Sequence, residues 1–124
     1  MSTVQSRQTF ANNILKVYTQ FNVDGIDIDW EFPGQAGNDG NVVSPSDSAN
    51  YLSFLQVLRK TLPPQAKITA AVMTVPWADS QGNPLKDVSA FAQVLDWVLI
   101  MNYDTWGCKS ICLSGSVNAY TQEV

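Results

Sequence analysis

The segment Asp24–Glu31, with the sequence DGIDIDWE, constrains this chain more than any other feature. Side chains on a β-strand alternate between its two faces. The alternation puts the acids on one face and the apolar residues on the other: Asp27, Asp29 and Glu31 against Ile26, Ile28 and Trp30. Acids on one face lie about 6.6 Å apart at about 3.3 Å per residue. We therefore expect at least one of them to keep its proton, as an active site with a proton donor beside ionised carboxylates requires.

Two alternatives to catalysis are an exposed acidic strand and a cation site. The face opposite the acids is too apolar for a free surface strand. A Ca²⁺ loop needs turn-forming glycine and ligands at loop spacing, whereas these acids repeat every second residue. The pattern favours catalysis over both. Asp24, at the beginning of the strand, is expected to fix the backbone there and not to take part in chemistry.

The rest of the chain predicts helices that alternate with strands. Two helical faces are expected, one with Phe10, Ile14, Val17 and Phe21 and one with Leu52, Leu55, Leu58 and Leu62. A long loop is expected from Pro33 to Pro45, and the second helix should begin at Ser46 or Asp47.

Further along, Lys67–Thr74 is predicted to be a strand, followed by a loop from Pro76 to Pro84. Asp87 should cap a third helix whose inward residues are Val88, Phe91 and Leu95. Trp97–Tyr103 is a nearly continuous apolar run, which predicts a strand buried on both faces. Alternating helices and strands predict an α/β fold with a parallel sheet.

Composition excludes several classes of function. The 124 residues suffice for one domain, and 45% apolar with 15% charged residues is typical of a globular chain. A net charge of −4 argues against nucleic acid or an anionic membrane as partner, and no apolar run approaches the roughly 20 residues of a membrane span. The N-terminus has no hydrophobic core of a signal peptide.

No cofactor or metal is expected. The sequence has no histidine, and Cys108 and Cys112 alone do not complete a zinc site. Whether these two cysteines are free thiols or pair elsewhere stays open, and they indicate no cellular compartment.

DGIDIDWE followed by Phe32-Pro33-Gly34 resembles the signature of family 18 glycoside hydrolases, the chitinases and their relatives. The later segment Met101–Asp104, with the sequence MNYD, resembles the M-x-Y-D segment of the same barrel. The resemblance implies a partial (β/α)8 TIM barrel. The three strands would be its fourth to sixth, with the helix before the fourth, and residues 1–124 a fragment of the catalytic domain. A complete barrel has eight strands and roughly 250 residues.

The resemblance also implies roles for individual residues in cleaving β-1,4 bonds between N-acetylglucosamine units. Glu31 matches the general acid and base, and Asp29 the residue that orients the substrate's acetamido group. Asp27 matches the neighbour that shares a proton with Asp29, and Tyr103 the phenol that hydrogen-bonds the acetamido oxygen. This family is a substrate-assisted exception to the two-carboxylate scheme, because the acetamido oxygen itself attacks.

Four further residues are candidates for binding the sugar. Met101 shares a face with Tyr103, with a packed core methionine as an equal alternative, and Asp104 follows directly. Trp77 and Trp106 begin loops after strands, where an indole is able to stack on a sugar ring. Trp30 and Trp97 are expected to be structural.

The sequence thus predicts an endo-acting chitinase-like hydrolase that binds chitin or chitooligosaccharides, its parent extracellular by resemblance. Two rival functions remain. One is a non-catalytic carbohydrate-binding relative, which the presence of Glu31 disfavours, and the other is an endo-β-N-acetylglucosaminidase acting on N-glycans. With three strands of a barrel, the chain alone is expected to be inactive and poorly soluble.

Overall fold

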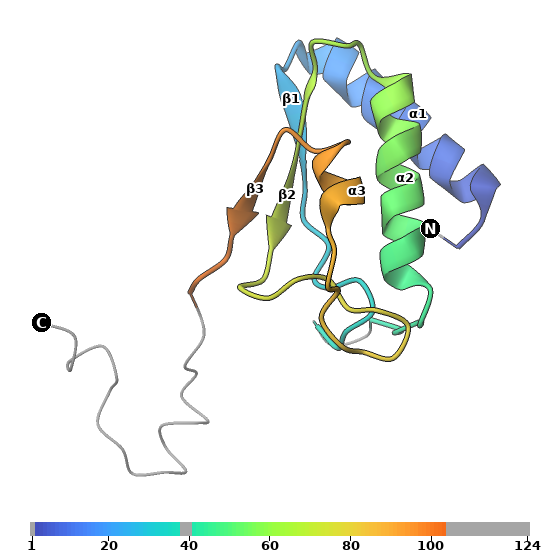
Figure 1. The fold of residues 1–124 in the computed structure, drawn as a ribbon. Coiled ribbons are helices and arrows are strands. Elements are labelled where there is room, and N and C mark those ends of the chain that lie inside the picture. Colours follow the sequence, from blue (N-terminus) through green and yellow to red (C-terminus); the bar gives the residue numbers. More distant parts are fainter. Residues whose placement is uncertain (1, 38–40, 104–124) are drawn as a thin grey trace, which may run out of the picture.

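The structure, a computed structural model, describes residues 2–37 and 41–103. Helices and strands alternate along the chain, as the sequence predicts (Figure 1). The elements are α1 (Val4–Phe21), β1 (Gly25–Ile28), α2 (Asp47–Thr61), β2 (Lys67–Val72), α3 (Ser89–Ala92) and β3 (Trp97–Ile100). Each strand is shorter than predicted, and β1 covers only the middle of the acidic segment.

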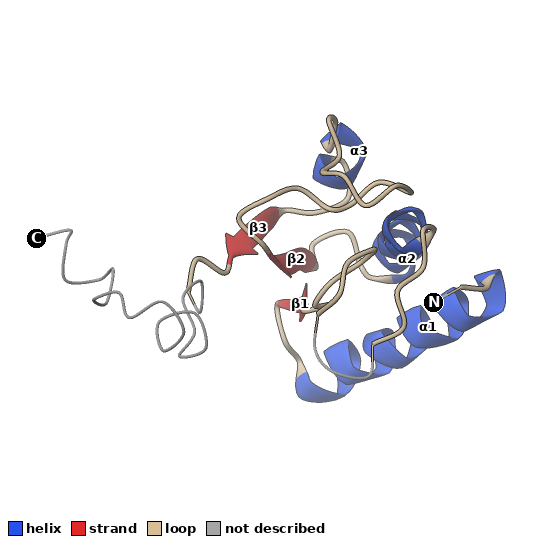
Figure 2. Cartoon of the chain, turned by 90° about the horizontal axis from the view of Figure 1, so that it is seen from below, coloured by secondary structure: helices blue, strands red, loops and turns tan. Residues whose placement is uncertain are grey.

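The three strands form one parallel sheet in the order β1-β2-β3. All three helices lie on the same side of this sheet, and no described element covers its other side (Figures 1 and 2). The strands β1 and β2 approach closely at Gly25, where an added Cβ would lie 2.5 Å from the carbonyl oxygen of Lys67. Only glycine fits there, so this position helps to fix the register that places the acids.

Helix α1 presents a different face from the one predicted. Thr3 and Ser6 form a capping box at its beginning, and Asn22 ends it in the left-handed conformation with φ 49°. Its inward row is Ala11, Ile14, Leu15 and Tyr18, which keeps helical spacing. Of the predicted face only Ile14 is buried, whereas Phe10, Val17 and Phe21 are exposed. The prediction followed the largest side chains, whereas the buried row includes the small residue Ala11. Phe10, although exposed, still stacks on Phe54 of α2, with 5.1 Å between the ring centroids.

The core lies between α2 and the sheet. Leu55, Leu58 and Leu62 are buried as predicted, with Leu52 half-buried at the periphery. Phe91 and Leu95 also point inward as predicted, but Val88 is 37% exposed and was wrongly assigned to the core. Val88 precedes the short helix α3 and lines an open pocket instead.

Strand β3 contradicts the prediction of burial on both faces. All four of its residues are exposed, from 41% for Val98 to 58% for Ile100. In the strand order, β3 lies at one edge of the sheet and pairs only with β2 among the described strands (Figure 2). An open apolar pocket, lined by Val98 and Ile100, leaves part of the strand uncovered. Among those residues no helix combines the length and apolar character needed to cross a membrane.

Candidate active site

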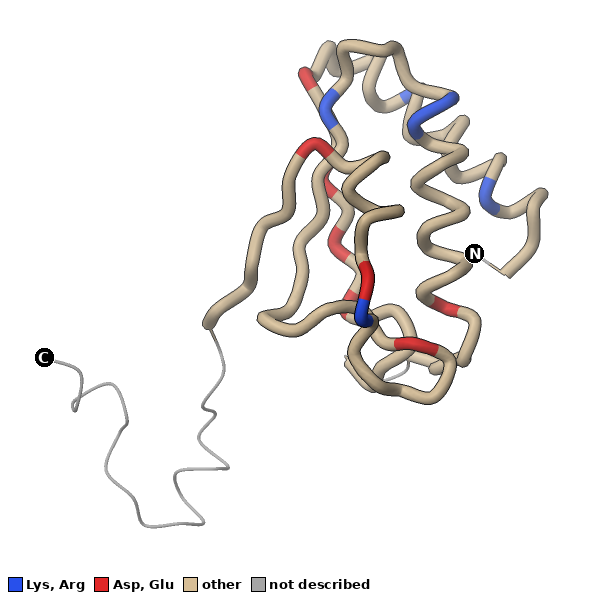
Figure 3. Tube along the Cα trace, in the orientation of Figure 1, with Lys and Arg blue, Asp and Glu red and all other residues tan. Residues whose placement is uncertain are grey.

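The acidic residues gather where β1 ends. The strand stops at Ile28, so Asp29 and Glu31 lie beyond it and not on the longer strand that was predicted. Acidic positions nevertheless follow one another along β1 and the loop after it (Figure 3). All three candidate acids line one open hollow of about 460 Å³, together with Phe10, Ile28, Trp30 and Asn41.

Alternation of side chains along β1 holds where the strand is regular. Ile28 is buried on the helix side, and Asp27 and Asp29 are exposed. Asp27 lies opposite Thr69 in the parallel register, and the Thr69 hydroxyl donates a hydrogen bond of 2.5 Å to Asp27 Oδ1. Thr69 is thus a site residue that the sequence reading missed, because a strand register cannot be read from one strand's pattern.

The backbone of Glu31 is held by the loop that follows it. Asn41 Nδ2 donates a hydrogen bond of 2.7 Å to the Glu31 carbonyl oxygen. Gly37 packs so closely on the same carbonyl that an added Cβ would lie 2.0 Å from its oxygen. Both contacts fix the main chain at Glu31, whose side chain is half-buried in the hollow.

Asp47, at the beginning of α2, holds both ends of the loop between Glu31 and α2. Its Oδ2 accepts hydrogen bonds from the backbone amides of Ser44, at 2.8 Å, and Gly34, at 3.4 Å. Gly34 has φ 73°, a conformation that favours glycine. A carboxylate in the first turn also interacts favourably with the helix dipole. The loop is therefore tied at both of its ends to α2 through one side chain.

Aromatic packing supports the acidic segment from the helix side. The ring of Trp30 meets the buried ring of Tyr51 edge-on, with 5.6 Å between centroids, as the structural role predicted for Trp30 requires. Burial and the nearby negative charges of Asp27 and Asp29 raise the pKa of the Tyr51 phenol well above its usual value. Tyr51 therefore stays neutral beside the acids.

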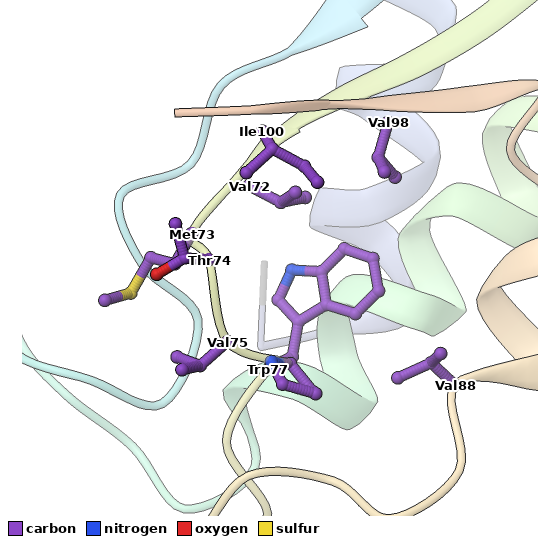
Figure 4. A pocket seen from close by; sticks show the side chains of 9 residues that line it. Val72, Met73, Thr74, Val75, Trp77, Val88, Val98 and Ile100 are labelled. Atoms are coloured by element: carbon purple, nitrogen blue, oxygen red, sulfur yellow. The ribbon is translucent and has the colours of Figure 1, made fainter. Parts of the chain in front are cut away.

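Trp77 lies away from the acidic hollow. Its indole stacks on Phe91 at 3.9 Å between centroids and lines a separate apolar pocket of about 250 Å³ (Figure 4). Val72, Val98 and Ile100 lie around the indole in this pocket. The structure thus places Trp77 in an apolar cluster, and its predicted stacking on a sugar stays a prediction.

The remaining candidates belong to the end of β3. Met101 is half-buried, and its amide donates to the Val72 carbonyl, which extends the β2–β3 pairing by one residue. Tyr103 is 61% exposed. Neither residue lines the acidic hollow, which lies at the end of β1, whereas β3 lies on the other side of β2. Asp104 and Trp106, like Cys108 and Cys112, lie outside the described residues.

The hollow combines features that suit proton transfer. Three carboxylic acids face one open space, and a neutral tyrosine and an apolar aromatic layer lie behind them. Within residues 2–37 and 41–103, no three His, Cys, Asp or Glu side chains gather in a way that could hold a metal ion. The three acids that line the hollow suit acid–base work on a bound ligand.

Comparisons with known proteins agree with the resemblance. A family model described as glycosyl hydrolases family 18 matches residues 1–121. A chitinase-like effector from Moniliophthora perniciosa is 42% identical over 112 residues, 89% of this chain and 25% of that protein. Chitinase A1 from Niallia circulans is 31% identical over 106 residues, 83% of this chain and 15% of that protein.

A solved chitinase structure from Rhizomucor miehei superposes with a TM-score of 0.80 at 32% identity, covering 85% of this chain and 29% of that one. The parallel α/β unit is therefore part of the TIM barrel fold of the chitinases. The chain spans about a quarter of the length of the Moniliophthora relative that it matches.

Proposed function

The chain belongs to the glycosyl hydrolases of family 18, and on that premise we propose that it carries the catalytic acids of a chitin-hydrolysing barrel. The observation that carries the proposal is the convergence of Asp27, Asp29 and Glu31 on one hollow at the end of β1. Barrel enzymes place their sites at the carboxyl ends of their strands. The three strands correspond to the fourth, fifth and sixth of the complete barrel, and residues 1–124 to part of its catalytic domain.

The mechanism assigns one task to each acid. Glu31 protonates the oxygen of the departing sugar while the substrate's own acetamido oxygen attacks the anomeric carbon. The glycosidic bond breaks, a cyclic oxazolinium ion forms, and no bond forms to the enzyme. Glu31, now ionised, then removes a proton from the water that opens this ion, so configuration is retained. The backbone contacts of Asn41 and Gly37 with Glu31 fit this role because they hold its main chain in place.

Asp29 orients the acetamido group and stabilises the positive charge on its nitrogen, and Asp27 shares a proton with Asp29. Tyr103 and Met101 contribute to the acetamido pocket, and Asp104, Trp77 and Trp106 contact the sugar. These assignments rest on the resemblance, and the position of Asp27 and Asp29 on the uncovered side of the sheet is compatible with them. Hydrolysis would be endo-acting. The whole protein would be extracellular, because a related Penicillium expansum protein is named a secreted chitinase.

A second candidate function is carbohydrate binding without hydrolysis. Relatives from two Moniliophthora species are named chitinase-like effectors and not chitinases. The presence of Glu31 favours hydrolysis over this alternative. An N-glycan substrate in place of chitin is a third reading, and it would use the same acids.

The proposal is tested with a complete barrel. The whole chain replaces its matching segment in the Rhizomucor miehei chitinase, a protein called the grafted barrel below, with the unmodified chitinase as the positive control. We expect the grafted barrel to release soluble sugars from a chitin oligomer and to leave an N-glycan intact. Binding of the oligomer without hydrolysis would support the second candidate function, carbohydrate binding alone. Cleavage of the N-glycan but not of the chitin oligomer would show that the substrate is an N-glycan and not chitin.

We propose that the chain by itself does not hydrolyse chitin. The outer strand β3 is exposed, and Leu99 is 49% exposed on the side where a closed barrel packs its interior. Unpaired strand edges and apolar surface of this kind favour aggregation. A monomeric chain that cleaves a chitin oligomer would contradict this.

A further inference from the structure

Thr69 brings a buried hydroxyl to the middle of the sheet. It is only 6% exposed and lies on the central strand β2, between Asp27 of β1 and Trp97 of β3 in the parallel register. A buried hydroxyl needs a hydrogen-bond partner, because leaving it without one costs free energy. The partner is Asp27 Oδ1, at 2.5 Å.

The position of the Thr69 hydroxyl relative to Asp27 is fixed by the strand backbone and by the few rotamers open to Thr69. Thr69 is β-branched, so its side chain has few rotamers in a strand. The ladder between β1 and β2 is pinned at Gly25, where the two main chains approach too closely for any other residue. The donor therefore has one position relative to Asp27, whereas Asp27 itself is exposed and would otherwise be free to rotate.

We propose that Thr69 is a positioning residue for Asp27, an inference that rests on the proposed function. Its hydroxyl holds one carboxylate oxygen and thereby fixes the plane of the Asp27 carboxylate toward Asp29. Asp29 is then held in the orientation that contacts the substrate's acetamido group. Thr69 touches neither substrate nor reacting atoms, and it acts only through Asp27.

The test replaces Thr69 in the grafted barrel. Thr69→Val keeps the shape of the side chain and removes the donor, and Thr69→Ser keeps the donor and removes the methyl group. Loss of a hydrogen bond to a charged group predicts a fall in kcat of about 10- to 100-fold for Thr69→Val, with KM unchanged. Thr69→Ser should retain kcat to within about threefold, since its hydroxyl makes the same charge-assisted bond.

A second readout does not depend on turnover. Affinity for a thiazoline analogue of the oxazolinium ion should fall in Thr69→Val, whereas binding of the neutral chitin oligomer should not. A merely structural role would weaken both together. Should Thr69→Val not melt cooperatively, Thr69→Ala carries the same comparison, because it removes the hydroxyl without demanding space.

The outcomes separate the two claims. A grafted barrel that does not cleave the chitin oligomer, whether or not it binds it, overturns the proposed function, and this inference with it. An active grafted barrel in which Thr69→Val keeps its kcat and its thiazoline affinity overturns the inference alone. Equal losses in Thr69→Val and Thr69→Ser would also overturn it, because the hydroxyl would then not be what matters.

Discussion

The indole of Trp30 meets the ring of Tyr51 edge-on, with 5.6 Å between the ring centroids and 84° between the ring planes. Trp30 lies in the chain between Asp29 and Glu31, so this contact anchors the segment that carries both acids. Tyr51 is almost fully buried and also contacts Trp77 and Phe91. The aromatic layer on the helix side thus holds the backbone from which the acids project.

Truncation of Trp30 should therefore loosen the site. In the grafted barrel we expect Trp30→Ala to lower the free energy of unfolding by about 3 kcal/mol, because removal of the large indole leaves a cavity. Trp30→Phe keeps a ring against Tyr51 and should lose about 1 kcal/mol. Urea denaturation measures both values. Equal losses for the two variants would show that the edge-on contact does not anchor the segment.

Asp47 should control the order of the loop that follows Glu31. Asp47→Ala removes the acceptor for the amides of Ser44 and Gly34, and we expect a stability loss of about 2 kcal/mol. Amide hydrogen exchange at Ser44 should become faster, while Asp47→Asn, which keeps a side-chain oxygen, should preserve most of the protection. If exchange at Ser44 is the same in all three proteins, Asp47 does not secure the loop.

Asp96 links the end of α2 to the sheet and should contribute to stability in a pH-dependent way. It accepts hydrogen bonds from the Ile68 amide, at 3.0 Å, and from Arg59 and Lys67. The donated hydrogen bond from the Ile68 amide, followed by those from Arg59 and Lys67, holds the Asp96 pKa well below its usual range.

A depressed folded-state pKa stabilises the protein above the unfolded value of about 3.9, and this contribution is lost as pH falls through the folded value. We expect Asp96→Asn to lower the free energy of unfolding by about 1–2 kcal/mol at neutral pH, with the difference shrinking below about pH 4. Thermal melts of the grafted barrel at several pH values measure this. Asp24→Asn, the same change at an exposed acid, provides the matched control. A constant difference between Asp96→Asn and the unmodified protein across acidic pH would argue against the linkage.

The alternation of acids and apolar residues along β1 made the acidic hollow predictable. Successive side chains on a strand point to opposite sides, and the exposed Asp27 and the buried Ile28 follow this rule. Glu31 reaches the same hollow from irregular backbone, and that geometry depends on Asn41 and Gly37, contacts that no periodicity encodes.

The predictions that failed concern burial and contacts between elements, which the pattern of a single element does not determine. The predicted face of α1 was wrong because apolar spacing does not show which of two neighbouring rows a helix buries: Ala11 is fully buried, whereas Phe10 and Val17 are exposed. The β3 prediction was wrong because an apolar run indicates what a strand could bury, and the described residues provide no cover for it. Thr69 escaped notice because its role depends on the register between two strands.

Inhibition and chelation should separate the substrate-assisted mechanism from a cation site. A thiazoline analogue should compete with the chitin oligomer in the grafted barrel, because enzymes bind the charge distribution of an intermediate better than that of the substrate. A chelator should leave the rate unchanged. Activity lost on chelation and restored by a divalent cation would revive the cation site, and a thiazoline that fails to inhibit an active barrel would contradict the substrate-assisted step.

The most direct measurement of the central claim is turnover of a chitin oligomer by the grafted barrel with Glu31→Gln. This change keeps the shape of the side chain and removes the proton donor, so kcat should fall by about 10²- to 10⁴-fold while oligomer binding persists. Asp24→Asn, a change at an acid outside the hollow, should keep normal turnover. Hydrolysis by Glu31→Gln at a rate close to that of the unmodified grafted barrel would contradict the assignment of Glu31 as the catalytic acid.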